Sequence, residues 1–585
     1  MNGTPTIVHV THETTQKIGG IGAVLKGFFT SQSYLNFAKR SIIVGPLFDK
    51  QSSVSKRLGE GGHVLYSFWD GLSNTRYAPS FQEIERIYNA GIVYGTKTFI
   101  DEQSGIESSQ EVILVDVTHM HKEPVDEVKK LLFEKFGIQS DRHEHIWEFE
   151  QYLRLAPVVI SILKAIDAAD DSTIIVGHEW MGMPTVLAAL SDAYTNFKTV
   201  FYAHEVATIR RIVEERPERD IGFYRELKLA QSQGKYLKEV FGDQSDYFKH
   251  QLIEASQNCH RVLAVGDFAA SELRFLNPGF KNAAIDVVYN GIGAYKTTVQ
   301  EKIASKAKLQ QYCENLLGYK PDFIITHVTR LVKSKGLWRD IGILENIERK
   351  LQQNGQSAVL FVVSTETSKR DPESIRFMES AYAWPVAHRE GWPDLSGGEA
   401  DFYTLVQKFN TRSRHAKALL INQFGFDKKS CGENMPDDIR LVDLRRGTDV
   451  ELGLSTYEPF GISHIEPLTY GGLCVISSIC GCAGFINRVT SQQPPENIII
   501  ADYIESQNHT KLDDAALTEI EKNVNEQLGE KISSRLLNID TEKMIQSGYS
   551  IAQKMSWDAV VSNYVLPNIQ AILQMEKIEI PSRLD

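Results

Sequence analysis

Two glutamates in the stretch STYEPFGISHIEPLTYGG (455–472) have the spacing of groups that could act together on a substrate. Glu458 and Glu466 are separated by seven residues and lie on either side of a Pro-Phe-Gly turn. Two carboxylates at one site can work as a general acid and a general base. The turn leads into a predicted helix, whose free N–H groups favour an anion. The question is which carboxylate serves chemistry and which serves structure.

Glu466 has two local explanations that require no substrate. Ser463 and Glu466 match a capping box, with the serine at the N-cap and the glutamate at the third helical position. Alternatively, the helix begins at Pro467, where proline is favoured, and Glu466 is the cap. Glu458 has no such explanation, because it precedes a proline in an extended segment and should project from a strand end. Glu458 is therefore the stronger candidate for function.

Cations follow a predicted strand in HVTRLVKSKGLWRDI (327–341). Arg330 and Lys335 leave the carboxyl end of this strand, shortly before Gly336 and a predicted helix. The guanidinium offers a planar fork and the ammonium a point charge, a combination that suits a diphosphate. Taken alone, such a segment is more often a solvated basic loop.

A glycine turn and two histidines also stand at predicted strand ends. KIGGIG (17–22) follows the first strand, and its glycines would let the backbone approach an anionic ligand closely. Histidines occur in GHEW (177–180) and AHE (203–205), each directly after an apolar run. The glycines also fit an ordinary turn, and a lone histidine is more often a satisfied core group than a catalyst. Because two histidines lie at successive strand ends and face a basic cluster, a functional role is favoured for them.

The elements that must position these residues are short apolar strands alternating with helices. Continuous β-branched runs predict strands that are covered on both faces, as in parallel sheets. The first series is TIVHV (6–10), SIIVG (41–45), VILVDV (112–117), TIIVG (173–177), TVFYA (199–203) and VLAVG (262–266), and the second is FIITHV (323–328), AVLFVVS (358–364), DIRLVDL (438–444), LCVIS (473–477) and NIIIA (497–501). This alternation predicts an α/β fold of doubly wound sheets.

The break between the two series predicts two Rossmann-like domains. We expect an N-terminal domain over 1–300 and a C-terminal domain over 301–555, with a helical insertion near 366–437. Ligands of open α/β sheets bind at the carboxyl ends of the strands. We therefore expect two domains that face each other across a cleft containing the site.

The composition excludes several classes of protein. The 585 residues are 42% apolar and 24% charged, as in ordinary globular domains. Lys plus Arg total 63 against 75 for Asp plus Glu, and the net charge of −12 argues against a nucleic-acid partner. No apolar stretch reaches the roughly 18 residues of a membrane span, and no secretory signal is visible. Six scattered cysteines suggest reduced thiols, so we expect a cytoplasmic protein without a transmembrane segment.

Four histidines, His119, His121, His143 and His145, could form a metal set in principle. They lie in polar stretches without a fixed ligand motif, so we expect no metal there.

Taken in order, KIGGIG, GHEW, AHEVATIRR, VYNGI, TRLVKSKG and EPFGISHIE resemble the retaining glycosyltransferases of the two-Rossmann-domain (GT-B) type, in particular the glycogen and starch synthases. The resemblance covers about residues 6–485, and its specific parts are the E-x7-E stretch and the R-x4-K-G loop. The final segment, SWDAVVSNYVLPNIQAIL (556–573), is similar to the terminal helices that cross back to the first domain in such enzymes. We expect residues 556–585 to do so here.

The resemblance implies four catalytic residues. Glu458 matches the carboxylate beside the transferred sugar, and His204 matches the histidine near its anomeric carbon. Arg330 and Lys335 match the pair that neutralises the donor diphosphate.

The resemblance also implies residues that bind substrate. Glu466 matches the carboxylate that bonds the ribose hydroxyls, and the backbone of Gly461 and Ile462 lies near phosphate and sugar. Lys17, Gly19 and Gly20 match the glycine turn by the diphosphate. His178 and Glu179 match the acceptor-side strand end, and Asn290 lies in the interdomain loop.

The implied chemistry suits these residue types. Departure of the nucleotide builds negative charge on the diphosphate and positive charge on the sugar ring, which cations and a carboxylate stabilise respectively. In this family, retention is attributed to front-face attack, with a leaving phosphate oxygen helping to accept the acceptor's proton. With two side-chain cations at the diphosphate, we expect no metal and no cofactor.

The leading prediction is transfer of a hexose, glucose, from UDP- or ADP-glucose to the end of an α-glucan such as glycogen. Alternative acceptors are another polysaccharide, a lipid-linked glycan or a small sugar, since EVATIRR departs from the family pattern and leaves the roles of Arg210 and Arg211 open.

Two other classes of protein fit the sequence less well. A sugar-nucleotide epimerase should lack the combination of E-x7-E and R-x4-K-G. A degenerate, non-catalytic sugar-binding protein would not be expected to retain Glu458 with both cations. The sequence leaves effectors and a homo-oligomeric state open.

Overall fold

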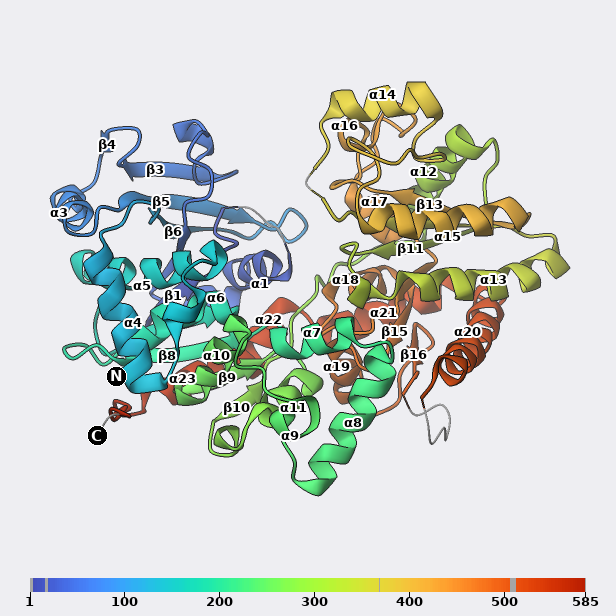
Figure 1. Cartoon of the computed structure of the whole chain (residues 1–585). Helices are drawn as coiled ribbons and strands as arrows, with labels where there is room; N and C mark the ends of the chain where they lie inside the picture. Colours follow the sequence, from blue (N-terminus) through green and yellow to red (C-terminus); the bar gives the residue numbers. More distant parts are fainter. Residues whose placement is uncertain (1–3, 16–18, 368, 505–511, 584–585) are drawn as a thin grey trace. The chain divides into compact units, whose positions relative to one another are not determined.

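All but one of the apolar runs predicted as strands lie in one of two separate sheets (Figure 1). The computed structural model describes residues 4–15, 19–367, 369–504 and 512–583. The chain divides into two units: unit 1 is Met1–Ile209, Leu229–Gly291 and Trp557–Asp585, and unit 2 is Arg210–Lys228 and Ile292–Ser556. Each unit has a sheet flanked by helices, which confirms the predicted class of two Rossmann-like α/β parts.

The sheet of unit 1 has ten strands in the order β10-β9-β8-β7-β1-β2-β6-β5-β3-β4. The strands are β1 (Thr6–Val10), β2 (Arg40–Pro46), β3 (Gly62–Ser67), β4 (Leu72–Ser73), β5 (Gly91–Ile100), β6 (Glu107–Asp116), β7 (Thr173–His178), β8 (Lys198–Ala203), β9 (Arg261–Ala264) and β10 (Ile285–Val287). The strands from β10 to β6 are parallel, whereas β5, β3 and β4 add an antiparallel edge that the sequence reading missed. This edge is half exposed at the far end of β5, so it lacks the continuous apolar pattern of the central strands.

Helices of unit 1 are α1 (Gly20–Phe29), α2 (Gln32–Phe37), α3 (Ala78–Tyr88), α4 (Lys122–Phe136), α5 (Trp147–Ala165), α6 (Glu179–Leu190), α9 (Leu237–Phe241), α10 (Phe248–Ala255) and α11 (Asp267–Leu276). Two more helices, α7 (Ala207–Glu215) and α8 (Arg219–Gln233), each run from one unit into the other along the chain.

The C-terminal helices return to unit 1, as predicted. They are α22 (Trp557–Val560) and α23 (Leu566–Leu573), joined by a π-helical turn. The carboxylate of Asp558 accepts hydrogen bonds from Ser31 Oγ and Ser33 N, both at 2.8 Å. The ring of Trp557 contacts that of Phe28 edge-on at 5.9 Å. These contacts attach the end of the chain to α1 and α2.

The sheet of unit 2 has six strands, all parallel, in the order β13-β12-β11-β14-β15-β16. The strands are β11 (Phe323–Val328), β12 (Ala358–Val363), β13 (Ala416–Ile421), β14 (Val450–Gly453), β15 (Leu473–Ser477) and β16 (Ile498–Ala501). The helices are α12 (Val299–Leu317), α13 (Leu337–Asn354), α14 (Pro372–Tyr382), α15 (Gly398–Arg412), α16 (Lys428–Cys431), α17 (Leu441–Gly447), α18 (Ile462–Ile465), α19 (Gly481–Val489), α20 (Asp514–Leu537) and α21 (Thr541–Lys554).

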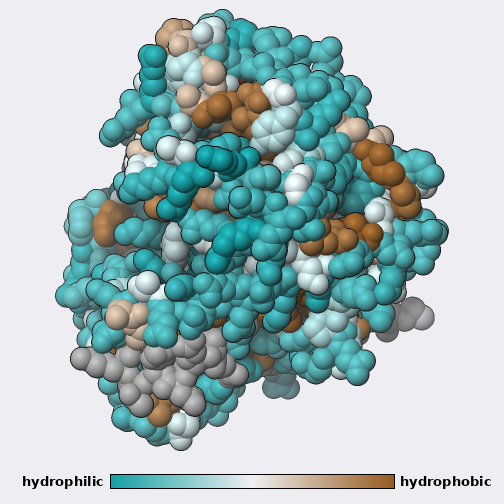
Figure 2. Space-filling view, turned by 90° about the vertical axis from the view of Figure 1, so that its right-hand side faces the viewer, coloured by the Kyte–Doolittle hydropathy of each residue, from teal (hydrophilic) through white to brown (hydrophobic). Residues whose placement is uncertain are grey.

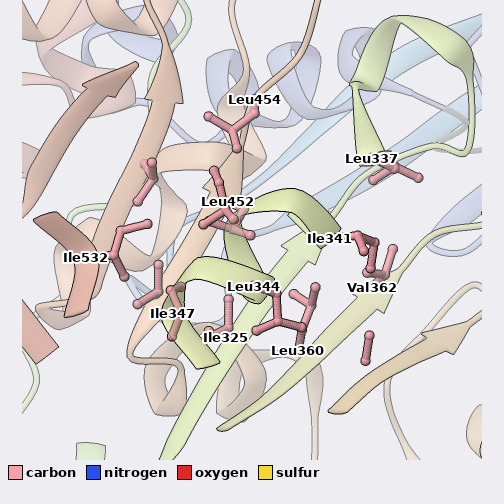
Figure 3. Packing of buried hydrophobic residues seen from close by; sticks show 14 of the residues in the cluster. Ile325, Leu337, Ile341, Leu344, Ile347, Leu360, Val362, Leu452, Leu454 and Ile532 are labelled. Carbon is pink, nitrogen blue, oxygen red and sulfur yellow. The ribbon is translucent and has the colours of Figure 1, made fainter. Parts of the chain in front are cut away.

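Apolar side chains cover both faces of this sheet. Ile325 and Leu360 pack with Leu344 of α13 on one face (Figure 3), while Ile324 and Phe361 belong to a second cluster on the other face. Successive strand residues point to opposite faces, so two clusters require helices on both sides. Fully burying each such side chain contributes about 1.5–3 kcal/mol. The sheet is therefore doubly wound, and α13 is held firmly against it.

One predicted strand is wrong, and two strands of unit 2 were missed. DIRLVDL is not a strand, because helix α17 begins at Leu441. The carboxylate of Asp443, the third helical residue, caps this start by accepting a hydrogen bond from the backbone N–H of Arg440 at 3.0 Å. The true strand β14 is VELG, and the buried Glu451 interrupts its apolar run. Strand β13, whose apolar run is interrupted by Lys417, lies within the 366–437 segment, which also contains α14, α15 and α16.

Among the described residues, no helix combines the length and the apolar character needed to cross a membrane. The face of the molecule in Figure 2 is mostly hydrophilic, and apolar residues form only small separate patches on it.

Candidate active site

The strand order of unit 2 reverses between β11 and β14. From β11 the chain continues to β12 and β13 on one side, and from β14 to β15 and β16 on the other. Ligands of open α/β sheets bind at the carboxyl ends of the strands at such a switch point. The loop after β11 carries Arg330 and Lys335, and the loop after β14 carries Glu458. The topology thus brings together the two motifs that the sequence singled out.

Lys335 and Glu458 form an ion pair, with 13% of each side chain exposed. Their loops are also joined through the backbone, because Ser334 O accepts hydrogen bonds from Thr456 N at 2.7 Å and Tyr457 N at 3.2 Å. The two motifs are therefore one rigid constellation within unit 2.

Electrostatics keeps Glu458 ionised. Burial alone would raise the pKa of this carboxyl, but Lys335, His464 and Arg330 outweigh that effect and lower its pKa to about 2. Arg330 itself is exposed at the end of β11. The site thus holds a carboxylate and two cations, one of them open to solvent.

The turn after Glu458 requires glycine. Gly461 has a φ of 89°, in the left-handed region that glycine adopts most readily. A Cβ there would lie 2.7 Å from Nδ1 of His464 and 3.1 Å from Cγ of Glu458. Ile462 then begins the one-turn helix α18. Nε2 of His464, a residue that was not predicted from the sequence, lies 3.7 Å from the carboxylate of Glu458. Burial lowers the pKa of His464 to about 3.

Neither local explanation of Glu466 is correct. The N-cap of α18 is Gly461 and makes no side-chain cap bond, so Ser463 lies inside the helix. Glu466 starts a 3₁₀ turn, and its carboxylate lies 2.7 Å from the guanidinium of Arg445. Arg445 is buried and also contacts Glu451 at 3.0 Å. An ion pair with a residue of α17 therefore holds Glu466. This pair could not be predicted, because the segment that leads to Arg445 has the apolar pattern of a strand.

The strand order of unit 1 reverses between β1 and β7, where the glycine turn and GHEW follow. Lys17 lies outside the described residues. Gly19 precedes α1 and Gly20 begins it, and a Cβ at Gly20 would meet no atom within 4 Å. The carboxylate of Glu13 accepts hydrogen bonds from Gly19 N and Gly22 N, both at 2.9 Å. Glu13, which was not predicted from the sequence, thus holds the backbone of Gly19 and Gly22.

The histidines after β7 and β8 lie together. Nδ1 of His178 is 2.8 Å from Nε2 of His204, and His178 is fully buried while His204 is partly exposed. Glu179 has a φ of 62° and accepts a hydrogen bond from Glu205 N at 2.6 Å. Burial and the nearby Glu205 raise the pKa of Glu179 well above its ordinary value. Strained backbone of this kind concentrates at functional sites.

The other candidates are a buried asparagine and two arginines of α7. Asn290 is buried in unit 1, and its Oδ1 has no hydrogen-bond partner among the described residues. Arg210 and Arg211 lie in α7 and pair with Glu214 at 3.1 Å and Glu215 at 2.9 Å. Among the described residues, no three or more His, Cys, Asp or Glu side chains gather into a metal-binding group.

No family model matches the chain, and no curated protein is detectably similar to it in sequence. Solved structures are similar over nearly the whole chain. The catalytic domain of starch synthase IV from Arabidopsis thaliana, bound to ADP and acarbose, has 14% identity and a TM-score of 0.50, covering 98% of this chain and 100% of its own. The chain has the GT-B fold. An α,α-trehalose-phosphate synthase (UDP-forming) from Burkholderia xenovorans, in complex with glucose-6-phosphate, shows the same GT-B similarity, with 11% identity, a TM-score of 0.50, and 97% and 100% coverage.

Proposed function

We propose that this chain is a retaining glycosyltransferase that moves glucose from UDP- or ADP-glucose to the end of an α-glucan such as glycogen. The observation that supports this most strongly is the Lys335–Glu458 pair at the switch point of unit 2, with Arg330 beside it. A carboxylate and two cations suit a reaction in which negative charge grows on a diphosphate and positive charge grows on a sugar. The GT-B fold is consistent with this chemistry.

Lys335 and Arg330 would bind the donor diphosphate. Lys335 is paired with Glu458, so an arriving diphosphate would compete with this carboxylate for the ammonium. Charge-assisted hydrogen bonds contribute about 1.5–3 kcal/mol each, against about 0.3–1 kcal/mol for an exposed helix N-terminus. The two side chains should therefore contribute more than the short helix α18. Glu458, partly released from Lys335, would then face the sugar with its negative charge.

The neighbouring residues would orient the donor. Glu466 has 38% of its side chain exposed, so its carboxylate can accept hydrogen bonds from the ribose hydroxyls while Arg445 holds it. The backbone N–H groups of Gly461 and Ile462 would lie near phosphate and sugar. Both assignments follow the family pattern.

The candidates of unit 1 would serve sugar and acceptor. His204, which is partly exposed, would contact the transferred sugar. Lys17, Gly19 and Gly20 would lie by the diphosphate. His178, which is fully buried, would act by holding His204. Glu179 would serve the acceptor from the same strand end, and Asn290 would bind substrate from the loop that connects the two domains.

A small sugar is the second candidate acceptor. It is favoured by the similarity to a trehalose-phosphate synthase solved with glucose-6-phosphate, whereas the starch synthase solved with ADP and acarbose favours a glucan.

The test is a thermal-shift screen of UDP-, ADP- and GDP-sugars, followed by product analysis with glycogen, maltooligosaccharides and glucose-6-phosphate. A ligand at 100 times its Kd should stabilise the fold by about 2.7 kcal/mol. We expect one nucleotide sugar to raise the Tm and to yield an α-linked product. If no nucleotide sugar shifts the Tm and none is consumed, the proposal is wrong.

A further inference from the structure

Three histidines of unit 1 form one hydrogen-bonded row. His9 lies in β1, His178 ends β7 and His204 follows β8, and these three strands are neighbours in the sheet. Nδ1 of His9 lies 2.9 Å from Nε2 of His178, and Nδ1 of His178 lies 2.8 Å from Nε2 of His204. Only 2% of His9 and 0% of His178 is exposed. The row therefore runs through the core and ends at the partly exposed ring of His204.

A tyrosine closes the buried end of the row. The hydroxyl of Tyr34 lies 2.9 Å from Nε2 of His9 and 3.1 Å from Oγ of Ser41. Tyr34 is 1% exposed and Ser41 5%. Burial raises the pKa of Tyr34 far above its ordinary value, so the phenol keeps its proton.

Burial also keeps the imidazoles neutral. It lowers the pKa of His9 and of His204 to about 3, and the pKa of His178 well below its ordinary value. A neutral imidazole has one N–H and one lone pair. A histidine between two partners must then donate to one and accept from the other. The tautomers of the row are consequently set together, in one of two directions.

Tyr34 decides the direction. A phenol is a stronger hydrogen-bond donor than a neutral imidazole, and an imidazole nitrogen is a stronger acceptor than a phenol oxygen. The favoured arrangement has Tyr34 donating to Nε2 of His9, His9 donating through Nδ1 to His178, and His178 donating through Nδ1 to Nε2 of His204. The proton of His204 then lies on Nδ1, a nitrogen that no described residue bonds.

We propose that Tyr34 and His9 are positioning residues that set the tautomer of His204, so that its Nδ1–H is a hydrogen-bond donor to a hydroxyl of the bound sugar. This rests on the sugar contact proposed for His204. In the reverse direction Nδ1 of His204 would be an acceptor, so the buried tyrosine decides which hydrogen bond the ring offers. A row of side chains that merely fills the core would not need a fixed direction.

The first test reads the tautomer without any substrate. The protein is labelled with ¹⁵N-histidine, and the His204 signals are assigned by their loss in His204→Gln. We expect the wild type to show a protonated Nδ1 and an unprotonated Nε2 on His204. We expect Tyr34→Phe to shift both signals toward the other tautomer. A wild-type His204 protonated on Nε2, or signals unchanged in Tyr34→Phe, would overturn the proposal whatever the enzyme's activity.

The second test reads catalysis. Tyr34→Phe should lower kcat by about tenfold with little change in the KM for the donor. This is the lower end of the roughly 10-fold to 100-fold cost of removing a group that orients a metal-binding histidine. Tyr66→Phe is the matched control, because Tyr66 is also buried in unit 1 and bonds Glu85 at 2.7 Å, away from the row. His9→Asn keeps a polar group next to His178 but no longer fixes the direction of the hydrogen bonds in the row. It should therefore behave like Tyr34→Phe. If Tyr34→Phe and His9→Asn both retain the kcat of Tyr66→Phe, the row is only structural.

Discussion

Asp220 and Arg339 form a bidentate ion pair inside unit 2, with both N–O distances at 2.9 Å and only 1% and 0% of their side chains exposed. Asp220 belongs to the segment Arg210–Lys228, which lies between two stretches of unit 1 in the sequence. Arg339 lies in the first turn of α13 and also donates to the carbonyl of Leu454 at 3.2 Å. The pair thus anchors this segment beside the loops that carry Lys335 and Glu458.

Asp220→Ala should strongly destabilise unit 2. Removing one partner of a buried ion pair costs about 3–5 kcal/mol, because the other charge stays buried and uncompensated. Glu521, at 3.2 Å from Arg339, can offset part of this loss. The measurement is urea unfolding of Asp220→Ala and of the double variant Asp220→Leu/Arg339→Met. We expect the double variant to lose less than the single one, and a larger loss in the double variant would contradict this account.

Glu458→Gln should change how stability depends on pH. The folded-state pKa of about 2 lies below the ordinary value of 4.5, so the ionised group stabilises the fold fully above pH 4.5 and loses this effect as pH falls toward 2. The difference in unfolding free energy between wild type and Glu458→Gln should therefore shrink between pH 5 and pH 2. A difference that stays constant over this range would show that Lys335 does not stabilise the carboxylate. At neutral pH, the variant should stay folded and lose transfer activity by orders of magnitude.

Arg330→Ala should lower kcat/KM by about 100-fold or more, as expected for a group that stabilises charge developing in the transition state. Its fold should persist, because an exposed substitution usually changes stability by less than about 0.5 kcal/mol. Arg376→Ala, at an exposed arginine of α14 in the same unit, is the matched control and should keep full activity. Turnover of nucleotide sugar by Arg330→Ala at the wild-type rate would refute the donor-site assignment.

Glu466→Gln should weaken binding of the nucleotide more than it slows chemistry. A ribose contact is equally present in the ground state and the transition state, so its loss raises KM and leaves kcat nearly unchanged. We expect KM for the donor to rise about tenfold, since a hydrogen bond to a charged group contributes about 1.5–3 kcal/mol. Donors lacking one ribose hydroxyl, the 2′- and 3′-deoxy forms, provide the control. At least one of these deoxy donors should bind the wild type less tightly than the parent donor does. The same deoxy donor should bind Glu466→Gln as tightly as the parent donor binds that variant. If wild type and variant discriminate equally against both, Glu466 does not contact the ribose.

Most central strands could be predicted because parallel strands covered on both faces need continuous apolar runs, and such runs are visible in one sequence. Strand β14 was not predicted because Glu451, which is buried and paired with Arg445, interrupts its run of apolar residues. The sequence also selected Arg330, Lys335 and Glu458, since their residue types follow strand ends. Their roles remain predictions.

The features that could be predicted are therefore local: strand periodicity, turns and the chemistry available at strand ends. Which of these groups meet depends on the tertiary structure. Lys335 finds Glu458, Arg445 holds Glu466, and Tyr34 reaches His204 through two buried rings. These partners lie on different elements, and the order of strands in the sheets, which no local pattern encodes, brings them together. Asp220 shows the same limit, because an aspartate in a polar helix carries no sign that its partner is an arginine 119 positions away in the other half of the chain.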